Sequence, residues 1–252
     1  MKQHQIKRSH IIHAAWALAT SLTSAQTVVP FSEPDFLEPG PGLSAATSQM
    51  ADFNGDGNLD LIAGGSGAEQ LGYREGVGDG SFLPEVGLNI GLGMRARGIF
   101  AVDYDNDGDI DLLAAEAISG SPEMHITLYR NDGSGSFTRS VLLTTDPSNF
   151  AGGFYIYADD LNGDDLPDIV YRKGTREVAY ALQQPDGTLG QEVLLSGSPS
   201  GDSLTMMIAD MDNDGNVDIV VCSRVEDGTF IVYYNDGSGN FTASAPIPAG
   251  DN

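Results

Sequence analysis

The sequence has a single cysteine, Cys222, among 252 residues, and only 12 Lys and Arg against 36 Asp and Glu, for a formal net charge of −24. One cysteine excludes an intramolecular disulfide framework. The shortage of positive charge excludes the basic surface that nucleic acid or an anionic membrane would need, so we expect neither partner. Hydrophobic residues still make up 40% of the chain, enough for a folded core rather than a disordered acidic tail.

Long hydrophobic runs are also lacking, and one short run lies near the start. Residues 1–25 carry basic residues, then this apolar run, then small residues, which is the order of a secretory signal peptide. A short buried helix or a membrane anchor is the alternative, although the run is too short to span a bilayer unaided. We therefore expect a secreted protein, extracellular or periplasmic, without membrane insertion. Its mature part, residues 26–252, keeps His125 as its one histidine and no tryptophan.

Glycine is abundant, at 32 residues, and it marks an internal repeat. Four nine-residue loops rich in Asp start 51, 57 and 50 residues apart, at residues 52–60, 103–111, 160–168 and 210–218. Turns that contain Asp-Gly follow in the same phase, at residues 78–82, 131–137, 185–189 and 235–241. Two signatures in phase indicate a repeated supersecondary unit of about fifty residues.

Each unit is predicted to consist of strands, because short apolar runs bounded by Gly and Asp are typical of buried strands. In the second unit, residues 98–102 precede the acidic loop and residues 112–115 follow it. A third run, 125–130, enters the Asn-Asp-Gly turn, which favours a hairpin, and a fourth, 137–143, leaves it. Four antiparallel strands per unit make the blade of a β-propeller. We predict an all-β fold with about four such blades, a partial or small propeller.

The acidic loops carry oxygen atoms at alternating positions, which predicts a Ca²⁺ site in each. Positions one, three, five and nine are Asp or Asn, and position seven can offer its backbone carbonyl. Oxygens spaced in this way converge on a hard cation when the chain curls around it. No His or Cys participates, which disfavours zinc and copper. The candidate metal residues are Asp52, Asn54, Asp56, Asn58, Asp60, Asp103, Asp105, Asp107, Asp109, Asp111, Asp160, Asn162, Asp164, Leu166, Asp168, Asp210, Asp212, Asp214, Asn216 and Asp218.

Three other interpretations of the loops stay open. Magnesium prefers a smaller octahedral shell that retains water. An EF-hand or dockerin-like module needs Glu at position twelve, where the four loops have Ala63, Ala114, Tyr171 and Val221 inside apparent strands. Plain turns rich in Asp and Gly would explain one such loop, but four in phase favour a shared ligand.

The Asp-x-Asp-x-Asp-Gly-x-x-Asp loops and the Asp-Gly-Ser-Gly-x-Phe turns resemble FG-GAP/VCBS-type repeats, the calcium-binding blades of integrin-α-like propellers, over about residues 30–252. The resemblance implies that each loop joins the first two strands of a blade. It also implies up to four structural Ca²⁺ ions held by the candidate residues. In the third loop Asp165 replaces the glycine of position six and must make the left-handed turn, and Pro167 is a second departure from the pattern, so we expect the weakest site there. The second loop has the most carboxylates and should bind most tightly.

The number of blades leaves closure of the ring open, because propellers of the family that this chain resembles usually have seven. Residues 31–42 resemble the outer strands that follow Phe82 and Phe137. An extra outer strand at the front could complete the last blade and close a small ring. Equally, the chain could be a piece of a longer array. Open blade edges pair with other chains, so a partial propeller is expected to self-associate.

The sequence favours a binding or adhesion scaffold over an enzyme, with an extracellular protein or glycan as ligand. His125 and Cys222 lie in strand-like runs, where packing is a commoner role than catalysis. One alternative is a polysaccharide lyase, for which Arg172, Lys173 and Arg176 form the notable basic cluster; we expect that cluster in a solvated loop. The other is a lectin, which the loss of tryptophan disfavours.

Overall fold

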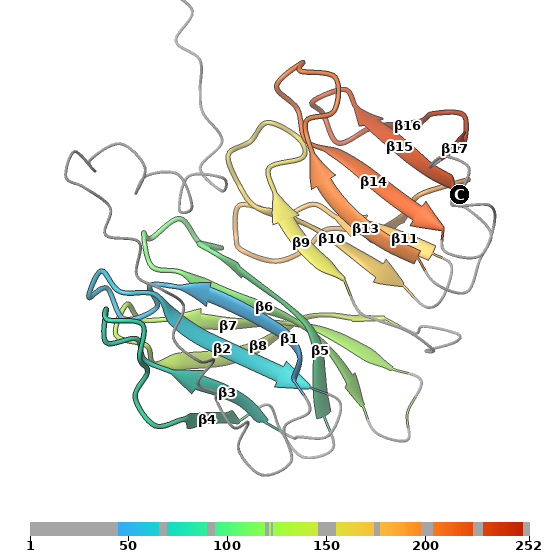
Figure 1. Ribbon diagram of the computed structural model, residues 1–252. Coiled ribbons are helices and arrows are strands. Elements are labelled where there is room, and N and C mark those ends of the chain that lie inside the picture. The colour runs from blue at the N-terminus through green and yellow to red at the C-terminus, as the bar shows by residue number, and fades with distance from the viewer. Residues whose placement is uncertain are drawn as a thin grey trace, which may run out of the picture. The chain divides into compact units, whose positions relative to one another are not determined.

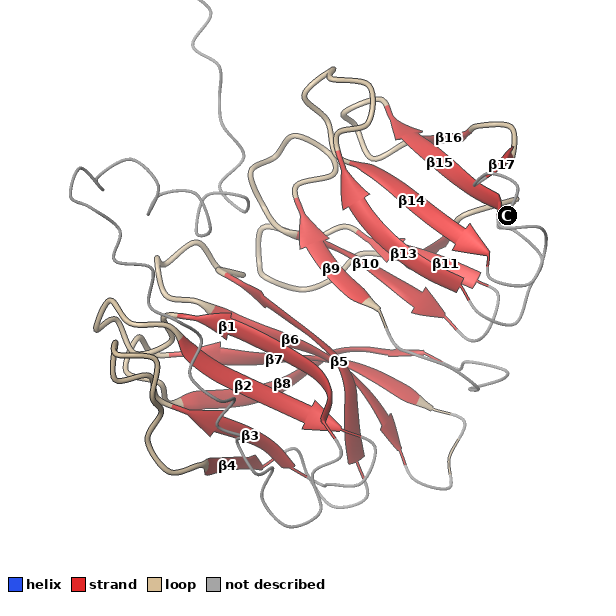
Figure 2. Ribbon diagram, in the orientation of Figure 1, coloured by secondary structure: helices blue, strands red, loops and turns tan. Residues whose placement is uncertain are grey.

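The computed structural model describes residues 45–248 except 66–69, 90–93, 119–120, 122, 146–154, 174–176, 198–203 and 224–228. The described residues form strands and loops without a helix (Figures 1 and 2). Their strands make four antiparallel sheets, which we call blades 1 to 4 in chain order. The predicted all-β architecture of four-stranded antiparallel blades is confirmed. The expected signal peptide, residues 1–25, and the front segment, 31–42, lie outside the described residues.

Within each blade, consecutive strands pair with one another. Blade 1 consists of β1 (Ala45–Ala51), β2 (Asp60–Gly65), β3 (Gln70–Arg74) and β4 (Val86–Asn89). Blade 2 consists of β5 (Met94–Val102), β6 (Asp111–Ile118), β7 (Met124–Asn131) and β8 (Phe137–Thr145). Blade 3 consists of β9 (Ile156–Asp159), β10 (Asp168–Lys173), β11 (Glu177–Ala181) and β12 (Val193–Leu194). Blade 4 consists of β13 (Leu204–Ala209), β14 (Asp218–Ser223), β15 (Thr229–Asn235), β16 (Phe241–Ala243) and β17 (Ile247–Pro248), and β16 and β17 both pair with β15.

The apolar runs of the sequence become these strands, and each acidic loop joins the first two strands of its blade. In blade 2, the predicted strand 98–102 is the second half of β5, which continues back to Met94 beside β6 through an irregularity between Ala96 and Gly98. His125 is half-buried in β7 and Cys222 is half-buried in β14. Among the described residues, no helix has the length and hydrophobicity that crossing a membrane requires.

The hydrophobic core lies between blades, because each sheet has two faces to cover. Blades 1 and 2 share a cluster in which Phe53, Tyr73 and Phe137 pack edge-to-face, with ring centroids 5.8 to 6.3 Å apart. Blades 3 and 4 share a second cluster, in which the rings of Tyr180 and Phe241 are 5.0 Å apart. Burial of this apolar surface is the main driving force that holds neighbouring blades together.

A buried amide side chain in the hairpin turn of blades 2, 3 and 4 reaches back to the preceding blade. In each case the amide nitrogen donates a hydrogen bond to the backbone carbonyl at position two of the acidic loop in the preceding blade. We call these contacts the amide clamps; they are Asn131 to Phe53 (2.6 Å), Gln183 to Tyr104 (3.2 Å) and Asn235 to Leu161 (2.9 Å). Because these bonds are shielded from water, losing one leaves a buried polar group unpaired.

Two sequence-based expectations are wrong. Arg172 and Lys173 do not lie in a solvated loop: both belong to β10, where Arg172 is 3% exposed and Lys173 forms an ion pair with Glu192. Arg176 lies outside the described residues. The first and third hairpin turns also begin two residues before the predicted 78–82 and 185–189, because Gly76 pairs with Phe82 and Gln183 with Leu189, whereas the predicted turns 131–137 and 235–241 have the expected bounds. The structurally equivalent first turn residues are Gly76, Asn131, Gln183 and Asn235.

Candidate metal centre

Each acidic loop reverses its direction twice within nine residues. Positions four and six have positive φ in all four loops. Position six is Gly in three loops, and in the third loop Asp165 adopts a φ of 64°. A left-handed turn at Asp165 is what the sequence predicted. Because a side chain makes this conformation less favourable than it is for glycine, the third loop carries strain at position six that the other loops avoid there. The second and fourth loops carry it instead at position four, at Asn106 and Asn213.

Aspartate at position one organises its loop from the inside. In the second loop, the carboxylate of Asp103 accepts hydrogen bonds from the backbone N–H groups of Asp107 and Gly108, both at 3.1 Å. The bond from position six to position one recurs in the other three loops. Position five accepts the N–H of position seven in every loop. The backbone is therefore already curled around the carboxylates.

Aspartate at position nine is fully buried in every loop and ties the loop to the hairpin turn of its own blade. In blade 2, Asp111 accepts the N–H of Tyr104 at 3.1 Å and that of Asn131 at 2.7 Å. The aspartates at position nine of the other loops, Asp60, Asp168 and Asp218, make the same two bonds. Sequence reasoning assigned this residue to the metal and missed its backbone role, because the second donor comes from a distant turn. Its place at the start of an apolar strand was the available signal.

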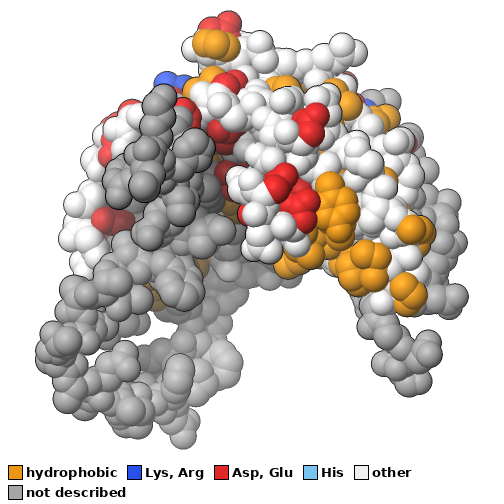
Figure 3. Space-filling view, turned by 90° about the horizontal axis from the view of Figure 1, so that it is seen from above, with side chains coloured by type: hydrophobic (Ala, Val, Ile, Leu, Met, Phe, Trp, Pro, Cys, Tyr) orange, Lys and Arg blue, Asp and Glu red, His pale blue; other side chains and the backbone are white. Residues whose placement is uncertain are grey.

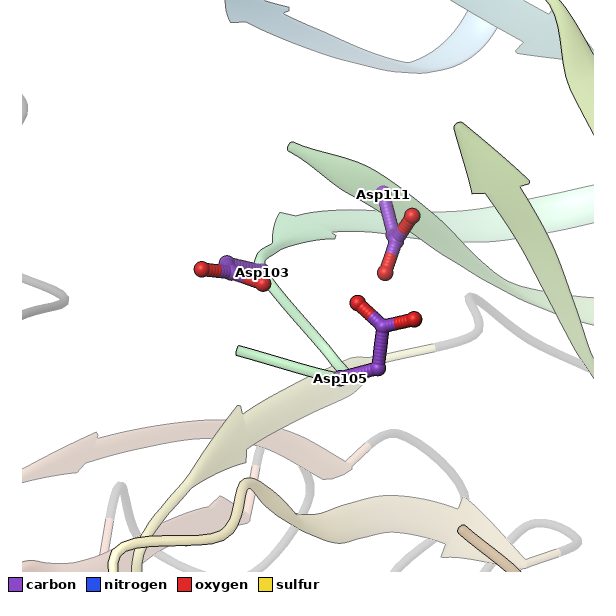
Figure 4. A group of neighbouring side chains, drawn as sticks. All are labelled: Asp103, Asp105 and Asp111. Atoms are coloured by element: carbon purple, nitrogen blue, oxygen red, sulfur yellow. The ribbon is translucent and has the colours of Figure 1, made fainter. Parts of the chain in front are cut away.

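Carboxylates at positions one, three and nine converge in the second and fourth loops. In each group the candidate ligand atoms lie within 4.8 Å of one another; the groups are Asp103, Asp105 and Asp111, and Asp210, Asp212 and Asp218. Figure 4 shows the carboxylates of Asp105 and Asp111 facing each other, with Asp103 beside them. In the first and third loops position three is Asn54 and Asn162, so an amide oxygen takes the place of one carboxylate.

Side chains at positions five and seven do not belong to these groups. Position five is exposed in all four loops. The position-seven side chain lies against a glycine of the hairpin turn: a Cβ on Gly133 would meet the Asp109 carboxylate, and a Cβ on Gly237 would meet the Asn216 amide. Both glycines also have positive φ, so the turn requires glycine for two reasons. This packing leaves the backbone carbonyl of position seven available as the metal ligand that the spacing predicts.

The carboxylates of the second loop already meet a positive charge from the protein. Arg130 Nη1 lies 2.7 Å from Asp105 Oδ2, while Asp105 Oδ1 is buried without a hydrogen-bond partner among the described residues. A buried acceptor oxygen without a partner costs free energy unless a cation reaches it. The other blades have Glu75, Leu182 and Tyr234 at the place of Arg130. Of the four loops, the second is thus the one with a guanidinium that competes for its carboxylates.

Replacing Arg130 with Met is expected to tighten Ca²⁺ binding by the second loop about threefold, since a half-exposed ion pair contributes up to about 1 kcal/mol. Isothermal titration calorimetry with Ca²⁺ measures the change. Arg130→Lys is the matched control, because it keeps the charge and should bind as the original chain does. Equal affinities in all three proteins would show that the guanidinium does not compete with the ion.

Burial raises the pKa of several carboxylates at positions one and nine of the loops. Desolvation raises the pKa of Asp111 to about 6 and that of Asp168 to about 7, from an ordinary 3.8, and backbone hydrogen bonds only partly offset it. Neighbouring carboxylates add to both increases. Desolvation also raises the pKa of Asp103. Each of these groups is therefore harder to ionise alone than beside a cation.

The donor set fits a hard divalent cation. All the candidate atoms are carboxylate, amide or backbone oxygens, and the orphaned oxygen of Asp105 lies within one group. Positions one, three and nine would hold the ion, with further oxygens from positions five and seven. A bound ion would supply charge neutralisation and a fixed loop geometry.

The sequence of this chain is similar to a known repeat family. The sequence matches the FG-GAP-like repeat at residues 52–114, 160–221 and 210–252, which together span more than half of the chain. No curated protein matches the sequence of this chain. Among solved structures, the V. cholerae biofilm matrix protein Bap1 is similar at 19% identity, with a TM-score of 0.36; the match covers 84% of this chain and 41% of that one. Three repeat matches, in phase with the acidic loops, place this chain in the FG-GAP-like repeat family.

Proposed function

We propose that the chain is a secreted repeat scaffold whose acidic loops bind structural Ca²⁺ and whose blades present a binding or adhesion surface to an extracellular protein or glycan. One observation carries the calcium part. Carboxylates at the same three positions converge in two loops that lie in different blades, and the donors are all oxygen. Such a set suits Ca²⁺ better than zinc or copper.

The hydrogen bonds suggest how the ion would act on the fold. An ion at positions one, three and nine would hold Asp111 and its equivalents ionised. Asp111 in turn holds the backbone of the hairpin turn that carries Asn131, and the Asn131 amide clamps the preceding blade. One ion would therefore stabilise both its own loop and the contact between two blades.

The remaining surface fits a scaffold. Acidic side chains gather in several groups on the face seen in Figure 3, where basic ones are few. A polysaccharide lyase would need an accessible basic side chain as its base. Arg172 is buried and Lys173 is paired with Glu192, so neither offers one. We therefore propose a binding role for this chain in preference to that of a lyase.

Native mass spectrometry of residues 26–252 tests the proposal by counting bound ions and chains together. We expect up to four Ca²⁺ ions per chain, all lost on chelation. Retention of the chain on immobilised extracellular glycans and proteins, with and without Ca²⁺, tests the adhesion part. A chain that binds no Ca²⁺ would overturn the metal assignment, and retention that survives chelation would separate adhesion from the ion.

The calcium-free protein is expected to be less stable at pH 7.5 than at pH 5. Asp111 and Asp168 have folded pKa values of about 6 and about 7, above the ordinary 3.8. The fold therefore binds these protons more tightly than the unfolded chain does, and this stabilisation is lost as the pH rises through the folded pKa values, by at most about 1.4 kcal/mol per pH unit and group.

Thermal unfolding in metal-free buffer at the two pH values measures the effect. Saturating Ca²⁺ should reverse the order, because protons compete with the ion. Asp186→Asn is the control: hydrogen bonds from Thr188 lower the pKa of this exposed turn carboxylate, so it stays ionised across the range. A metal-free melting temperature that rises with pH would contradict the prediction.

A further inference from the structure

Two of the four acidic loops contain the dipeptide Asn-Gly at positions three and four. It is Asn54-Gly55 in the first loop and Asn162-Gly163 in the third, and in both it lies between an apolar residue and Asp. The second and fourth loops have Asp-Asn at these positions. Because glycine has no side chain to shield its backbone nitrogen, an asparagine before glycine is the one whose side-chain amide is most open to attack by the chain itself.

The attack requires only the loop and water. The backbone nitrogen of Gly55 loses its proton to solvent and attacks Cγ of Asn54. The new N–Cγ bond closes a succinimide ring, the Cγ–Nδ2 bond breaks, and the side-chain nitrogen leaves as ammonia. Water then opens the ring at either of its carbonyl carbons, which leaves aspartate or isoaspartate in place of Asn54. The net change is hydrolysis of one amide to a carboxylate and ammonia.

The folded first loop holds the reacting groups together. Asn54 Oδ1 accepts the backbone N–H of Asp56 at 3.1 Å. This bond closes a small ring of atoms that includes both Asn54 Cγ and the Gly55 nitrogen, so the attack joins two atoms that are already held near each other. The same N–H would stabilise the negative charge that develops on Oδ1. Gly55 is exposed, and none of the described groups accepts a hydrogen bond from its nitrogen.

The third loop restrains the equivalent nitrogen. Asn162 Oδ1 accepts the N–H of Asp164 at 2.9 Å, as in the first loop. The Gly163 N–H, however, donates to Asp160 Oδ1 at 2.7 Å. This bond must break before the nitrogen can attack, so Asn162 should react more slowly than Asn54. The shared dipeptide and its matching neighbours in the sequence do not predict such a difference.

We propose that Asn54, and more slowly Asn162, deamidates in the folded chain and that the product changes the metal affinity of its loop. The second and fourth loops show what the aspartate product would complete, a group of three carboxylates at positions one, three and nine. Isoaspartate would instead route the backbone through the side chain and displace the ligands that follow. The effect on affinity rests on the proposed function, whereas the reaction does not.

Peptide mass spectrometry measures the reaction in chain that is aged under conditions where circular dichroism shows it folded. Asn213 is the internal reference, because it is exposed in the fourth loop but is followed by Asp. We expect Asn54 to convert many-fold faster than Asn213 and several-fold faster than Asn162, and an isoaspartate methyltransferase should label the product. In urea, Asn54 and Asn162 should convert at similar rates, because the bond to Asp160 is lost.

Two results would count against the reaction as proposed. If Asn54 of the folded chain survives as long as Asn213, the modification site is wrong. If Asn162 of the folded chain converts as fast as Asn54, the hydrogen bond to Asp160 does not protect it, and the order of the two sites is wrong.

A pair of variants tests the effect on affinity separately. Asn54→Asp reproduces the aspartate product, and Asn58→Asp adds the same charge at position seven, whose side chain lies outside the converging groups. Isothermal titration calorimetry should show about tenfold tighter Ca²⁺ binding by the first loop of Asn54→Asp, because ligand charge helps to set Ca²⁺ affinity, and little change for Asn58→Asp. Equal tightening in both variants would overturn the effect of position three. If Asn54 deamidates but none of these proteins binds Ca²⁺, the proposed function fails and the modification site stands.

Discussion

Removal of Ca²⁺ is expected to unfold the chain at or near physiological temperature. One ion present at a hundred times its dissociation constant stabilises a fold by about 2.7 kcal/mol, so four would contribute about 11 kcal/mol. The whole free energy of unfolding of a typical domain is about 5–15 kcal/mol. Without the ions, the carboxylates at positions one, three and nine of the second and fourth loops also repel one another, because their ligand atoms lie within 4.8 Å.

Circular dichroism during heating, with saturating Ca²⁺ and after chelation, measures this loss. Mg²⁺ at the same concentration is the control, and it should restore little of the stability because it accepts the larger shell poorly. If the chelated chain melts within a few degrees of the loaded one, the backbone hydrogen bonds of the loops suffice, and Ca²⁺ is not a structural ion here.

The second large effect is expected at position nine. Asp111→Ala removes the acceptor of two buried N–H groups, those of Tyr104 and Asn131. Each unsatisfied group costs about 1–3 kcal/mol, so the variant should lose about 2–6 kcal/mol even in chelator. Urea unfolding in chelator isolates this loss from any contribution of the ion.

Asp107→Ala is the matched control, because position five is exposed and its loss leaves both buried bonds intact. In chelator this variant should unfold within about 0.5 kcal/mol of the original chain. In Ca²⁺ both variants should lose stability if both residues are ligands. Similar losses for the two variants in chelator would mean that Asp111 acts through the metal alone.

Local signals in the sequence were sufficient to predict the blades. The strands, the acidic loops and the left-handed turn at Asp165 all follow from apolar runs, alternating oxygens and glycine spacing within nine or ten residues. Their repetition in phase then indicated the family. These features depend on neighbours in the chain, so a single sequence contains them.

Features that depend on distant pairing were not predictable in this way. The two donors to Asp111 lie on opposite sides of it in the chain, and the Asn131 clamp joins residues 78 positions apart. Arg172 was misplaced for the same reason: its charge suggested a loop, but β10 pairs with strands on both sides and buries it. Strand pairing, rather than residue type, decided its environment.

The amide clamps also determine how the row of blades would bear a mechanical load. Asn131 and Asn235 each donate to two carbonyls, one in the preceding blade and one in their own. Gln183 makes one longer bond, and its own carbonyl oxygen is buried without a partner among the described residues. Pulled from its two ends, the row is therefore expected to part first between blades 2 and 3. An adhesive chain built in this way would lengthen in one defined step while each pair of blades stays folded.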